Sequence, residues 1–497
     1  MKQKMNTLSS YLKSSLIAMR LILLCVLLFP FLSGPGQAAI DLPHLGDASG
    51  TIISPEEERR LGEAFMRELR RSVKIVDDTE SNEYLQSLGQ RIVSHANYRG
   101  AFTFFLVDAP SINAFAAPGG YIGIHTGLVL ATQSESELAS VIAHEIAHIT
   151  QRHLPRAFEQ ASKLSLPTAA ALIAALILGQ GSSQATEAVL ATALAGTQQS
   201  QINFTRANEK EADRIGMQLL TDSGFDPKGM PQFFSRLQQA YRFYENNLPE
   251  FLRTHPVTLS RISDSTNRAA QYPPFKGKTL TNYAFFQARL RILSNPSSSN
   301  NINYFKAKIK DQNDPKSLAA RYGYTLGLIQ SGKLKKALIE AQNLVNHDKE
   351  NIVFILLKSQ ILLLQTKHQA AIEQLQEALL LYPKHNALTS YYGQALIKNK
   401  DHEEARQVLQ SQLHYTKKDP NLHKLYARAA SGAGYPADSH QALSEYYYLI
   451  GETSTAIQQL QLALNLIKKK NFYQSVRINA RIRDLKKELQ ESLERKH

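Results

Sequence analysis

Small residues recur at a fixed interval in the C-terminal half of this 497-residue chain. Ala337, Ala371 and Ala405 lie 34 residues apart in helix-forming stretches, and Ala456 follows 51 residues later, one and a half intervals on. A 34-residue interval is typical of paired helices with a small residue where they cross. Stacked pairs form a solenoid with a concave binding surface. We therefore expect an all-α tetratricopeptide array over residues 313–497.

The N-terminus has the pattern of an export signal. Residues 1–20 contain four basic and no acidic side chains, an apolar run spans residues 21–32, and small residues offer a cleavage site after Ala38. The apolar run is shorter than the roughly 20 residues that a membrane span needs. We therefore interpret residues 1–38 as a cleavable signal peptide and expect the protein to be exported.

The net charge and the cysteine content limit the kinds of molecule that the protein is expected to bind. The chain has 57 basic and 43 acidic residues, and four of the basic ones precede Ala38, so the exported part carries a net charge of +10. Cys25, the one cysteine, lies in the signal peptide, so no disulfide is expected. The positive charge is compatible with anionic lipid surfaces. Export and the lack of a basic-aromatic motif argue against a nucleic-acid partner.

The chemistry of the chain is concentrated in an HExxH pattern at residues 144–148. His144 and His148 are four residues apart and therefore lie on one helix face, where both can bind one metal ion. Glu145 lies about 100° round the helix, in reach of a water molecule that the metal polarises. A chance match with two buried histidines is the alternative interpretation. The apolar flanks at residues 137–151 favour a metal site.

Alternating helix and strand patterns surround this stretch. A Ser-Pro-Glu-Glu-Glu sequence at residues 54–58 predicts a helix start, and a second helix is expected at 81–96. Residues 102–107 and 121–124 have strand composition. We expect an α+β zincin-type metallopeptidase domain with a small sheet over residues 39–294. A Ser- and Asn-rich segment then predicts a linker at residues 295–312.

A catalytic zinc site usually has three protein ligands, so a third is needed. His153 does not fit the extended HExxHxxGxxH pattern, and we expect it to pack nearby or support a ligand. Glu209 and Asp213 are four residues apart on a predicted helix, which suits one metal ligand and one acceptor that orients a ligand histidine. Glu211 is expected to face solvent. A solvated acidic helix face is the alternative interpretation.

Together these motifs resemble a known metallopeptidase family. The HExxH pentad, the Glu209-x-x-x-Asp213 pair and the segment 113–120 are similar to HtpX, the CaaX prenyl protease and Oma. With the signal peptide and the repeats, the chain resembles the periplasmic β-barrel assembly-enhancing proteases of that family. The resemblance implies one Zn²⁺ per chain, held by His144, His148 and Glu209.

The resemblance also implies roles for residues farther along the chain. It places His255, in a Thr-His-Pro sequence, beside the metal, either as a fourth ligand at rest or as a stabiliser of the oxyanion. Arg261 is expected to contact substrate or the sheet. A substrate strand is expected to add to the sheet edge formed by Asn113, Ala114, Phe115 and Ala116.

Two functions from different classes fit these expectations. One is a zinc endopeptidase whose array binds clients, with the resemblance implying unfolded or misassembled outer-membrane proteins and the β-barrel assembly machinery. The other is a chaperone or assembly factor whose array is the main activity and whose zinc site is largely latent. The apolar segment 164–178 adds a further alternative. We favour a helical hairpin packed over the site, and the other interpretation is a surface for peripheral membrane or client contact.

Overall fold

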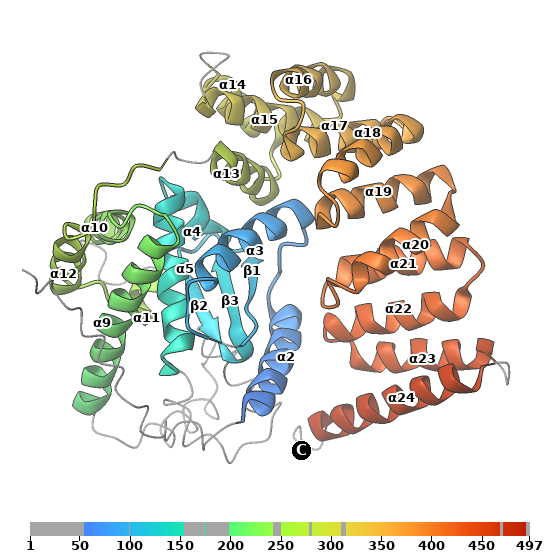
Figure 1. Ribbon diagram of the computed structural model, residues 1–497, viewed down its shortest axis with the longest axis horizontal. Coiled ribbons are helices and arrows are strands. Elements are labelled where there is room, and N and C mark those ends of the chain that lie inside the picture. Colours follow the sequence, from blue (N-terminus) through green and yellow to red (C-terminus); the bar gives the residue numbers. More distant parts are fainter. Residues whose placement is uncertain are drawn as a thin grey trace, which may run out of the picture. The chain divides into compact units, whose positions relative to one another are not determined.

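The computed structural model describes residues 54–98, 100–153, 173, 198–241, 250–277, 281–309, 315–467 and 471–493. The predicted signal peptide lies outside these residues, as does nearly all of the apolar segment 164–178. In the described part, a small sheet packs among helices and a long series of helices follows it (Figure 1). None of the helices described is long and apolar enough to cross a membrane.

The sheet has three strands in the order β1-β3-β2. β1 (Thr103–Val107) runs parallel to the central strand β3 (Tyr121–His125), and β2 (Ala114–Ala117) runs antiparallel to it. The strands expected at residues 102–107 and 121–124 are therefore present. A short 3-10 turn, η3 (Pro118–Gly120), joins β2 to β3. β3 is the central strand and is fully buried. The strand order makes β2 an outer strand, and β2 lies close to the buried helix that follows the sheet.

Helix α2 (Pro55–Ser72) begins where the sequence predicts. The Ser54 backbone N–H donates to the Glu57 carboxylate at 2.9 Å, and the Glu57 N–H donates to the Ser54 hydroxyl at 3.2 Å. This reciprocal cap satisfies two donors that a helix start leaves free. Helix α3 (Thr79–Val93) is capped by Asp78 and starts two residues before the predicted bound. Both helices lie beside the sheet (Figure 1).

Two helices form the centre of the first core. All residues of α5 (Glu135–Thr150) from Glu137 to Ile149 are buried, and α5 packs along α9 (Gln198–Asp222). Gly216 makes this close approach possible, because a Cβ there would lie 3.1 Å from the His144 Cα and backbone N atoms. Around these helices lie α4 (Thr126–Ala131), α10 (Gly229–Tyr241), α11 (Glu250–Thr254), α12 (Leu259–Ala269) and α13 (Thr281–Ser294).

The predicted linker at residues 295–312 is partly helical. Residues 298–306 form α14 (Ser298–Lys306), which packs on the next helix, so this part of the linker expectation is wrong. Ser297 caps the helix, and Phe305 is buried in the core that follows. The Ser and Asn residues that favoured a linker serve as the cap and the first turn.

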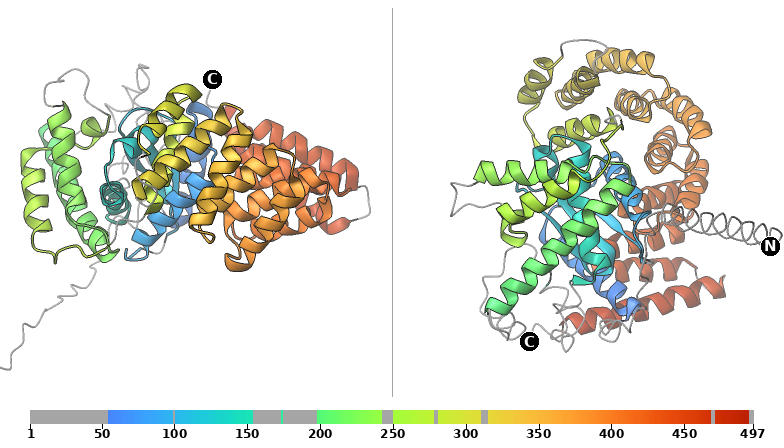
Figure 2. Two further views of the ribbon diagram at one scale, coloured as in Figure 1. Left: turned by 90° about the horizontal axis from the view of Figure 1, so that it is seen from above. Right: turned by 60° about the vertical axis from the view of Figure 1, so that its left-hand side comes forward.

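The following helices stack in sequence order, as Figure 2 shows. Ala337, Ala371, Ala405 and Ala456 are each fully buried where neighbouring helices pack, which confirms the interpretation of the 34-residue interval. The helices of the array are α15 (Pro315–Gln330), α16 (Leu334–His347), α17 (Ile352–Leu364), α18 (His368–Leu381), α19 (Asn386–Asn399), α20 (His402–Leu413), α21 (Pro420–Gly432), α22 (Pro436–Leu449), α23 (Thr453–Ile467) and α24 (Phe472–Leu493).

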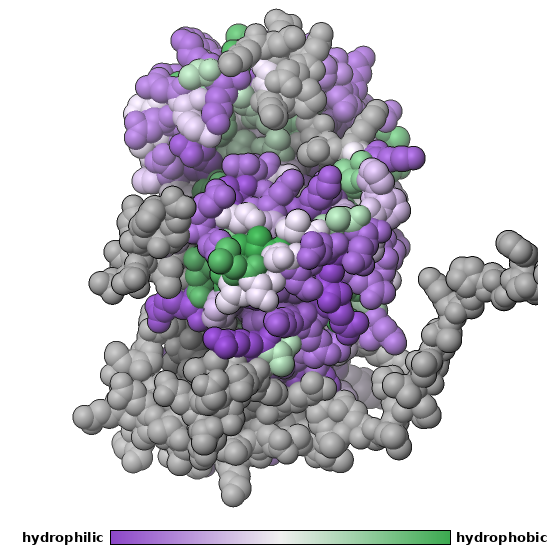
Figure 3. Space-filling model, turned by 90° about the vertical axis from the view of Figure 1, so that its left-hand side faces the viewer, coloured by the Kyte–Doolittle hydropathy of each residue, from purple (hydrophilic) through white to green (hydrophobic). Residues whose placement is uncertain are grey.

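Residues 51–497 form one compact unit. One joint within it connects α3 to α19. The Glu83 carboxylate accepts hydrogen bonds from the backbone N–H groups of Asn386 at 3.1 Å and Ala387 at 2.7 Å, and Tyr391 donates to Glu80 at 3.0 Å. A side chain of α3 therefore caps the first turn of α19. The face in Figure 3 is mainly hydrophilic around one compact hydrophobic patch.

Candidate metal centre

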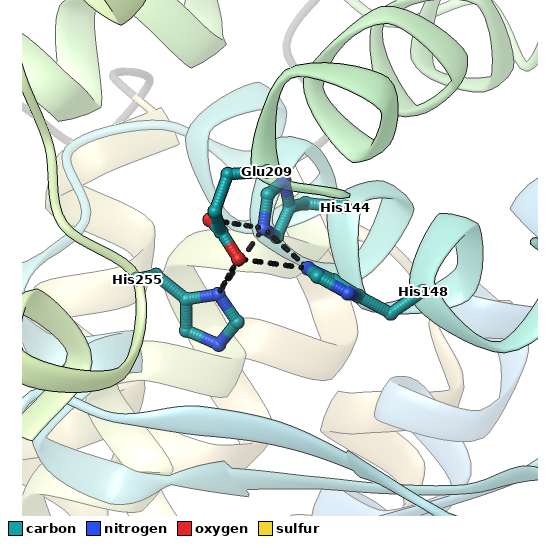
Figure 4. Close-up of side chains that lie close together, drawn as sticks. All are labelled: His144, His148, Glu209 and His255. Carbon is teal, nitrogen blue, oxygen red and sulfur yellow. Dashed lines mark hydrogen bonds and ion pairs between the residues drawn. The ribbon is translucent and has the colours of Figure 1, made fainter. Parts of the chain in front are cut away.

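Four metal-binding side chains converge in the buried core (Figure 4). His144 and His148 come from the buried face of α5, Glu209 comes from α9, and His255 follows α11. One nitrogen or oxygen atom from each residue lies within 4.8 Å of the other three. All four residues are at most 9% exposed. The structure thus brings together both histidines of the HExxH pattern and the carboxylate 61 residues beyond His148.

The spacing of these atoms fits a small tetrahedral ion. The His144 and His148 Nε2 atoms are 3.0 Å apart, and Glu209 oxygens lie 3.4 Å and 3.3 Å from them. His255 Nδ1 lies 3.0 Å from Glu209 and 3.4 Å from His144 Nε2. An ion with bonds of roughly 2.0–2.1 Å places tetrahedral ligands about 3.3–3.4 Å apart. The donor set and these spacings therefore fit a metal ion among His144, His148 and Glu209, with His255 close by.

Asp213 and Arg261 form a second layer behind the ligands. Asp213 Oδ1 lies 3.1 Å from His144 Nδ1, and the Arg261 guanidinium donates two 2.7 Å hydrogen bonds to the Asp213 carboxylate. Arg261 Nη1 also lies 2.8 Å from Glu209 and donates to the Pro256 carbonyl at 3.0 Å. These bonds fix the ring of His144 and the carboxylate of Glu209.

Arg261 differs from the expectation that it contacts substrate or the sheet. Its side chain is buried, and its polar atoms bind Asp213, Glu209 and Pro256. Arg261 lies in the first turn of α12, behind the metal-binding atoms. Its observed contacts are therefore with the residues of the cluster and with the loop that carries His255.

The structure also corrects the expectation for Glu211. His153 Nδ1 lies 2.9 Å from His148 Nδ1, and His153 Nε2 lies 3.2 Å from Glu211 Oε2. Glu211 is therefore paired with His153 instead of facing solvent alone. Arg152, with φ 55, turns the chain after α5 so that His153 points back at His148. His148 thus has a histidine–carboxylate support, as His144 has an aspartate–arginine support.

The electrostatics of the cluster favour a cation. Burial opposes protonation of His144, but the Asp213 and Glu209 carboxylates raise its pKa to about 10, while burial lowers the pKa of His148 to about 4. Burial raises the pKa of Glu209, but His255 and the two other histidines hold it well below its usual value. An ionised carboxylate among three imidazoles is a donor set suited to zinc and similar ions.

Glu145 lies beside the cluster without a metal-binding contact. Its carboxylate is 1% exposed, and Oε1 has no hydrogen-bond partner among the described residues. His255 Nε2 approaches it at 3.6 Å, too far for a good hydrogen bond. A buried carboxylate oxygen without a partner is costly and is a place for a water molecule or a substrate group. Glu145 therefore has the position that a general base requires.

The loop that carries His255 touches the sheet edge. The Phe251 N–H donates to the Ile112 carbonyl at 3.2 Å, and the Phe251 ring packs against His255 with centroids 5.0 Å apart. The Asn113 carbonyl faces β3 and accepts a hydrogen bond from the His125 backbone N–H at 3.0 Å. In an antiparallel strand, the backbone N–H and C=O groups of successive residues point to opposite sides of the strand. Those of Ala114 and Ala116 therefore point away from β3. The residues expected to bind a substrate strand therefore lie on the outer edge of β2, next to α11.

Sequence patterns missed two of these contacts. His153 was expected near a ligand, but its pairing with Glu211 crosses from the end of α5 to α9, so no local spacing reveals it. A histidine five residues after His148 and an acid two residues after Glu209 were the available signals. The contact of Phe251 with Ile112 joins residues 139 positions apart, and it left no signal in the sequence.

Comparisons with known proteins agree with this geometry. Residues 79–269 match the model of peptidase family M48, and residues 362–429 match a tetratricopeptide repeat model. The chain is 36% identical to the beta-barrel assembly-enhancing protease of Yersinia pestis, over 90% of this chain and 92% of that protein. It is 35% identical to the Escherichia coli K12 protein of the same name, over 92% and 93%. Mitochondrial metalloendopeptidase OMA1 of Arabidopsis thaliana is 27% identical over 44% of this chain and 42% of that protein.

The fold and site define a metallopeptidase of family M48 joined to a tetratricopeptide array. Identity of 35–36% over nine-tenths of both chains shows to which group of M48 peptidases the chain belongs. The chain belongs to the family of beta-barrel assembly-enhancing proteases.

Proposed function

We propose that this chain is a periplasmic zinc endopeptidase that acts in the assembly and quality control of outer-membrane β-barrel proteins. The observation that carries the proposal is the buried cluster of His144, His148 and Glu209 with Glu145 beside it. These three residues would hold one Zn²⁺. Two histidines and one carboxylate are a set that catalytic zinc sites use.

The chain's own residues account for the remaining steps of peptide hydrolysis. A zinc ion held by His144, His148 and Glu209 would supply a Lewis acid for a water molecule and for a carbonyl oxygen. Glu145 takes the proton of the attacking water through its free Oε1 and delivers it to the leaving amine. Asp213 and Arg261 hold His144 and Glu209 in place, and His153 holds His148.

We propose that substrate binds as an extended strand on the outer edge of β2. The backbone groups of Ala114 and Ala116 that face away from β3 provide the hydrogen bonds, which makes binding independent of most side chains. Asn113 Oδ1 is buried without a partner among the described residues and is available to a substrate N–H at the same edge. A peptidase that removes many different misassembled proteins requires this kind of recognition.

His255 is proposed as a fourth ligand that restrains the resting enzyme. Support comes from its Nδ1 atom, which lies 3.0 Å from Glu209 and 3.4 Å from His144 Nε2, and from the contact of α11 with Ile112 at the proposed substrate edge. A filled fourth position leaves no place for the catalytic water. Client binding would shift the loop and open that position.

The expected result for His255→Ala is faster cleavage of an unfolded substrate with an unchanged zinc content. The competing role, oxyanion stabilisation, predicts a rate loss of about 10²–10³. Turnover of one unfolded substrate by the parent protein and by the variant, with zinc measured in each sample, shows whether the change makes cleavage faster or slower. A slower variant with full zinc would rule out restraint as the main role.

The proposed clients are unfolded or misassembled outer-membrane proteins, with the β-barrel assembly machinery as a partner of the array. The named relatives support this assignment, and a stacked-helix array offers an extended binding surface. The export signal at residues 1–38 supports a periplasmic location.

The decisive experiment is casein digestion by purified protein and by Glu145→Gln. The variant keeps every proposed ligand, so it should retain about one zinc per chain and lose roughly 10²–10⁴-fold in cleavage rate. Metal content by atomic spectroscopy is the control for folding of the site. Equal cleavage by both proteins would place the chemistry elsewhere and favour a chaperone with a latent zinc site.

A further inference from the structure

The last helix of the array begins with an exposed apolar turn. Phe472 is 73% exposed and Tyr473 is 81% exposed at the start of α24, and Val476 follows one turn later at 47%. The two aromatic rings contact one another with centroids 5.9 Å apart. Large apolar side chains at this exposure, in one place, usually mark a contact surface.

These residues share one helix face with basic side chains. At 100° per residue, positions 472, 473, 476, 477, 480, 483, 484 and 487 fall on one side of α24. Ile478, Ile482 and Leu485 fall on the other side and are buried against the array. The solvent face therefore has an apolar end and a polar continuation along the helix.

The polar continuation is positively charged. The exposed basic residues of α24 are Arg477, Arg483, Lys486 and Lys487, and Asp484 is the exposed acid among its described residues. The other described charges of the helix are occupied: Arg481 pairs with Glu445, and Glu488 pairs with Arg67. Arg477, Arg483 and Lys487 share this face with Asp484, so it carries a net charge of about +2 beside its aromatic end, and Lys486 lies at its edge.

We propose that this face of α24 binds an anionic lipid surface. An apolar end beside exposed bases is the pattern of helices that lie at a membrane interface, where aromatic rings enter the headgroup region and bases meet acidic headgroups. The net charge of +10 of the exported part of the chain acts in the same direction. The inference does not depend on the peptidase chemistry, because α24 lies outside the metal centre.

A lipid surface suits this face better than a protein groove. Its apolar part is limited to the exposed residues Phe472, Tyr473 and Val476, and it continues into charges that a protein partner would have to pair one by one. A membrane surface can bind the apolar part and the charged part together, because lipid headgroups do not have to pair with particular side chains. Contact through α24 would keep the peptidase close to membrane proteins during their assembly.

The absence of tryptophan from the chain allows a specific probe. In Phe472→Trp the single indole reports only on the proposed contact. We expect its emission to move to shorter wavelength on addition of phosphatidylglycerol vesicles and to stay unchanged with phosphatidylcholine vesicles. The matched control is Leu381→Trp, at a position 60% exposed on α18, whose emission should not move.

Charge reversal tests the electrostatic part. Arg483→Glu with Lys487→Glu should weaken vesicle binding at least about 25-fold, since each basic side chain near an anionic surface contributes about fivefold. Lys335→Glu with Lys336→Glu makes the same change of charge on exposed positions of α16 and should leave binding within about fivefold of the parent. Added salt should weaken binding by the parent protein.

Three outcomes overturn the proposal. One is an unchanged emission of Phe472→Trp with anionic vesicles, which would assign the face to a protein partner. Another is an equal shift of both tryptophan variants, which would show adsorption without a defined face. The third is equal weakening by both charge pairs, which would assign binding to net charge alone. Casein cleavage is measured in parallel, so a failed peptidase proposal is seen separately.

Discussion

Glu209 and Glu211 lie two residues apart on α9 and act on different parts of the metal centre. Glu209 contacts all three histidines of the cluster, whereas Glu211 reaches the site only through His153 and His148. Removal of a charge at the two positions therefore has unequal consequences. Loss of a ligand removes a metal bond, and loss of a supporting group typically costs 10–100-fold in metal affinity.

We predict that Glu211→Gln weakens metal binding about tenfold and that Glu209→Gln weakens it considerably more. Competition with a chromogenic chelator gives both affinities without an activity assay. Glu377→Gln, an exposed carboxylate of the array, is the control and should have no effect. Equal losses at positions 209 and 211 would remove Glu209 from the ligand set.

Single residues were predictable from the sequence where local spacing decides their neighbours. The pairs His144–His148 and Glu209–Asp213 are each four apart on a helix, so the sequence places each pair on one face. The burial of Arg261 was not predictable, because it depends on the packing of α12 against α9. An arginine in a polar sequence gives no sign that two carboxylates will bury it.

At the scale of elements, the site depends on how closely α5 and α9 approach. Gly216 lies against the backbone of His144, and Glu209 is seven residues, about two turns, before it on α9. Any side chain at position 216 has to move one helix away from the other. The carboxylate of Glu209 would move with α9.

We predict that Gly216→Val lowers metal affinity and costs about 1–3 kcal/mol in the free energy of unfolding, because overpacking forces backbone shifts. Gly216→Ala adds a single carbon 3.1 Å from His144 and should have a smaller effect in the same direction. Chelator competition and urea unfolding followed by circular dichroism measure both quantities. Wild-type metal affinity in the valine variant would show that the crossing does not set the site.

The order and start of elements were partly predictable. Caps and strand composition gave α2, β1 and β3 to within a few residues, because these signals are local. The recurring alanines gave the array, because each helix pair needs a small residue at its crossing. The pairing of β2 with β3 and the helix within the expected linker depend on tertiary contacts. Sequence composition alone favoured a loop at residues 298–306.

At the scale of the whole molecule, contacts between α3 and α19 join segments 303 residues apart. Nothing in the sequence predicted that Glu83 would cap α19. The joint includes a second buried carboxyl, since Glu80 bonds Tyr391 and lies 2.9 Å from Arg289. Burial raises the pKa of Glu80 and of Glu83 to about 7 each. Such groups make the joint sensitive to pH.

For Glu83 the direction follows from the two states of the chain. The ordinary pKa of a glutamate side chain is 4.5. Burial and the nearby Asp419 raise the pKa of Glu83 in the folded chain, and the hydrogen bonds from the Ala387 and Asn386 backbone N–H groups lower it. The net result is a pKa of about 7. Between these values the folded chain holds a proton that the unfolded chain has lost. The stabilising contribution is complete below about pH 4.5 and is lost as pH rises through 7.

We therefore predict that the free energy of unfolding of the parent protein falls more steeply from pH 5 to pH 8 than that of Glu83→Gln, by about 1–3 kcal/mol. Glutamine keeps an acceptor for the α19 backbone and does not titrate. Glu80 titrates in both proteins, so its contribution cancels in the difference except for the part of its raised pKa that the Glu83 charge causes. Urea unfolding followed by circular dichroism at several pH values measures the two slopes, with Glu377→Gln as the exposed control. Parallel curves for all three proteins would mean that Glu83 stays ionised in the folded chain and that the α3–α19 joint does not respond to pH.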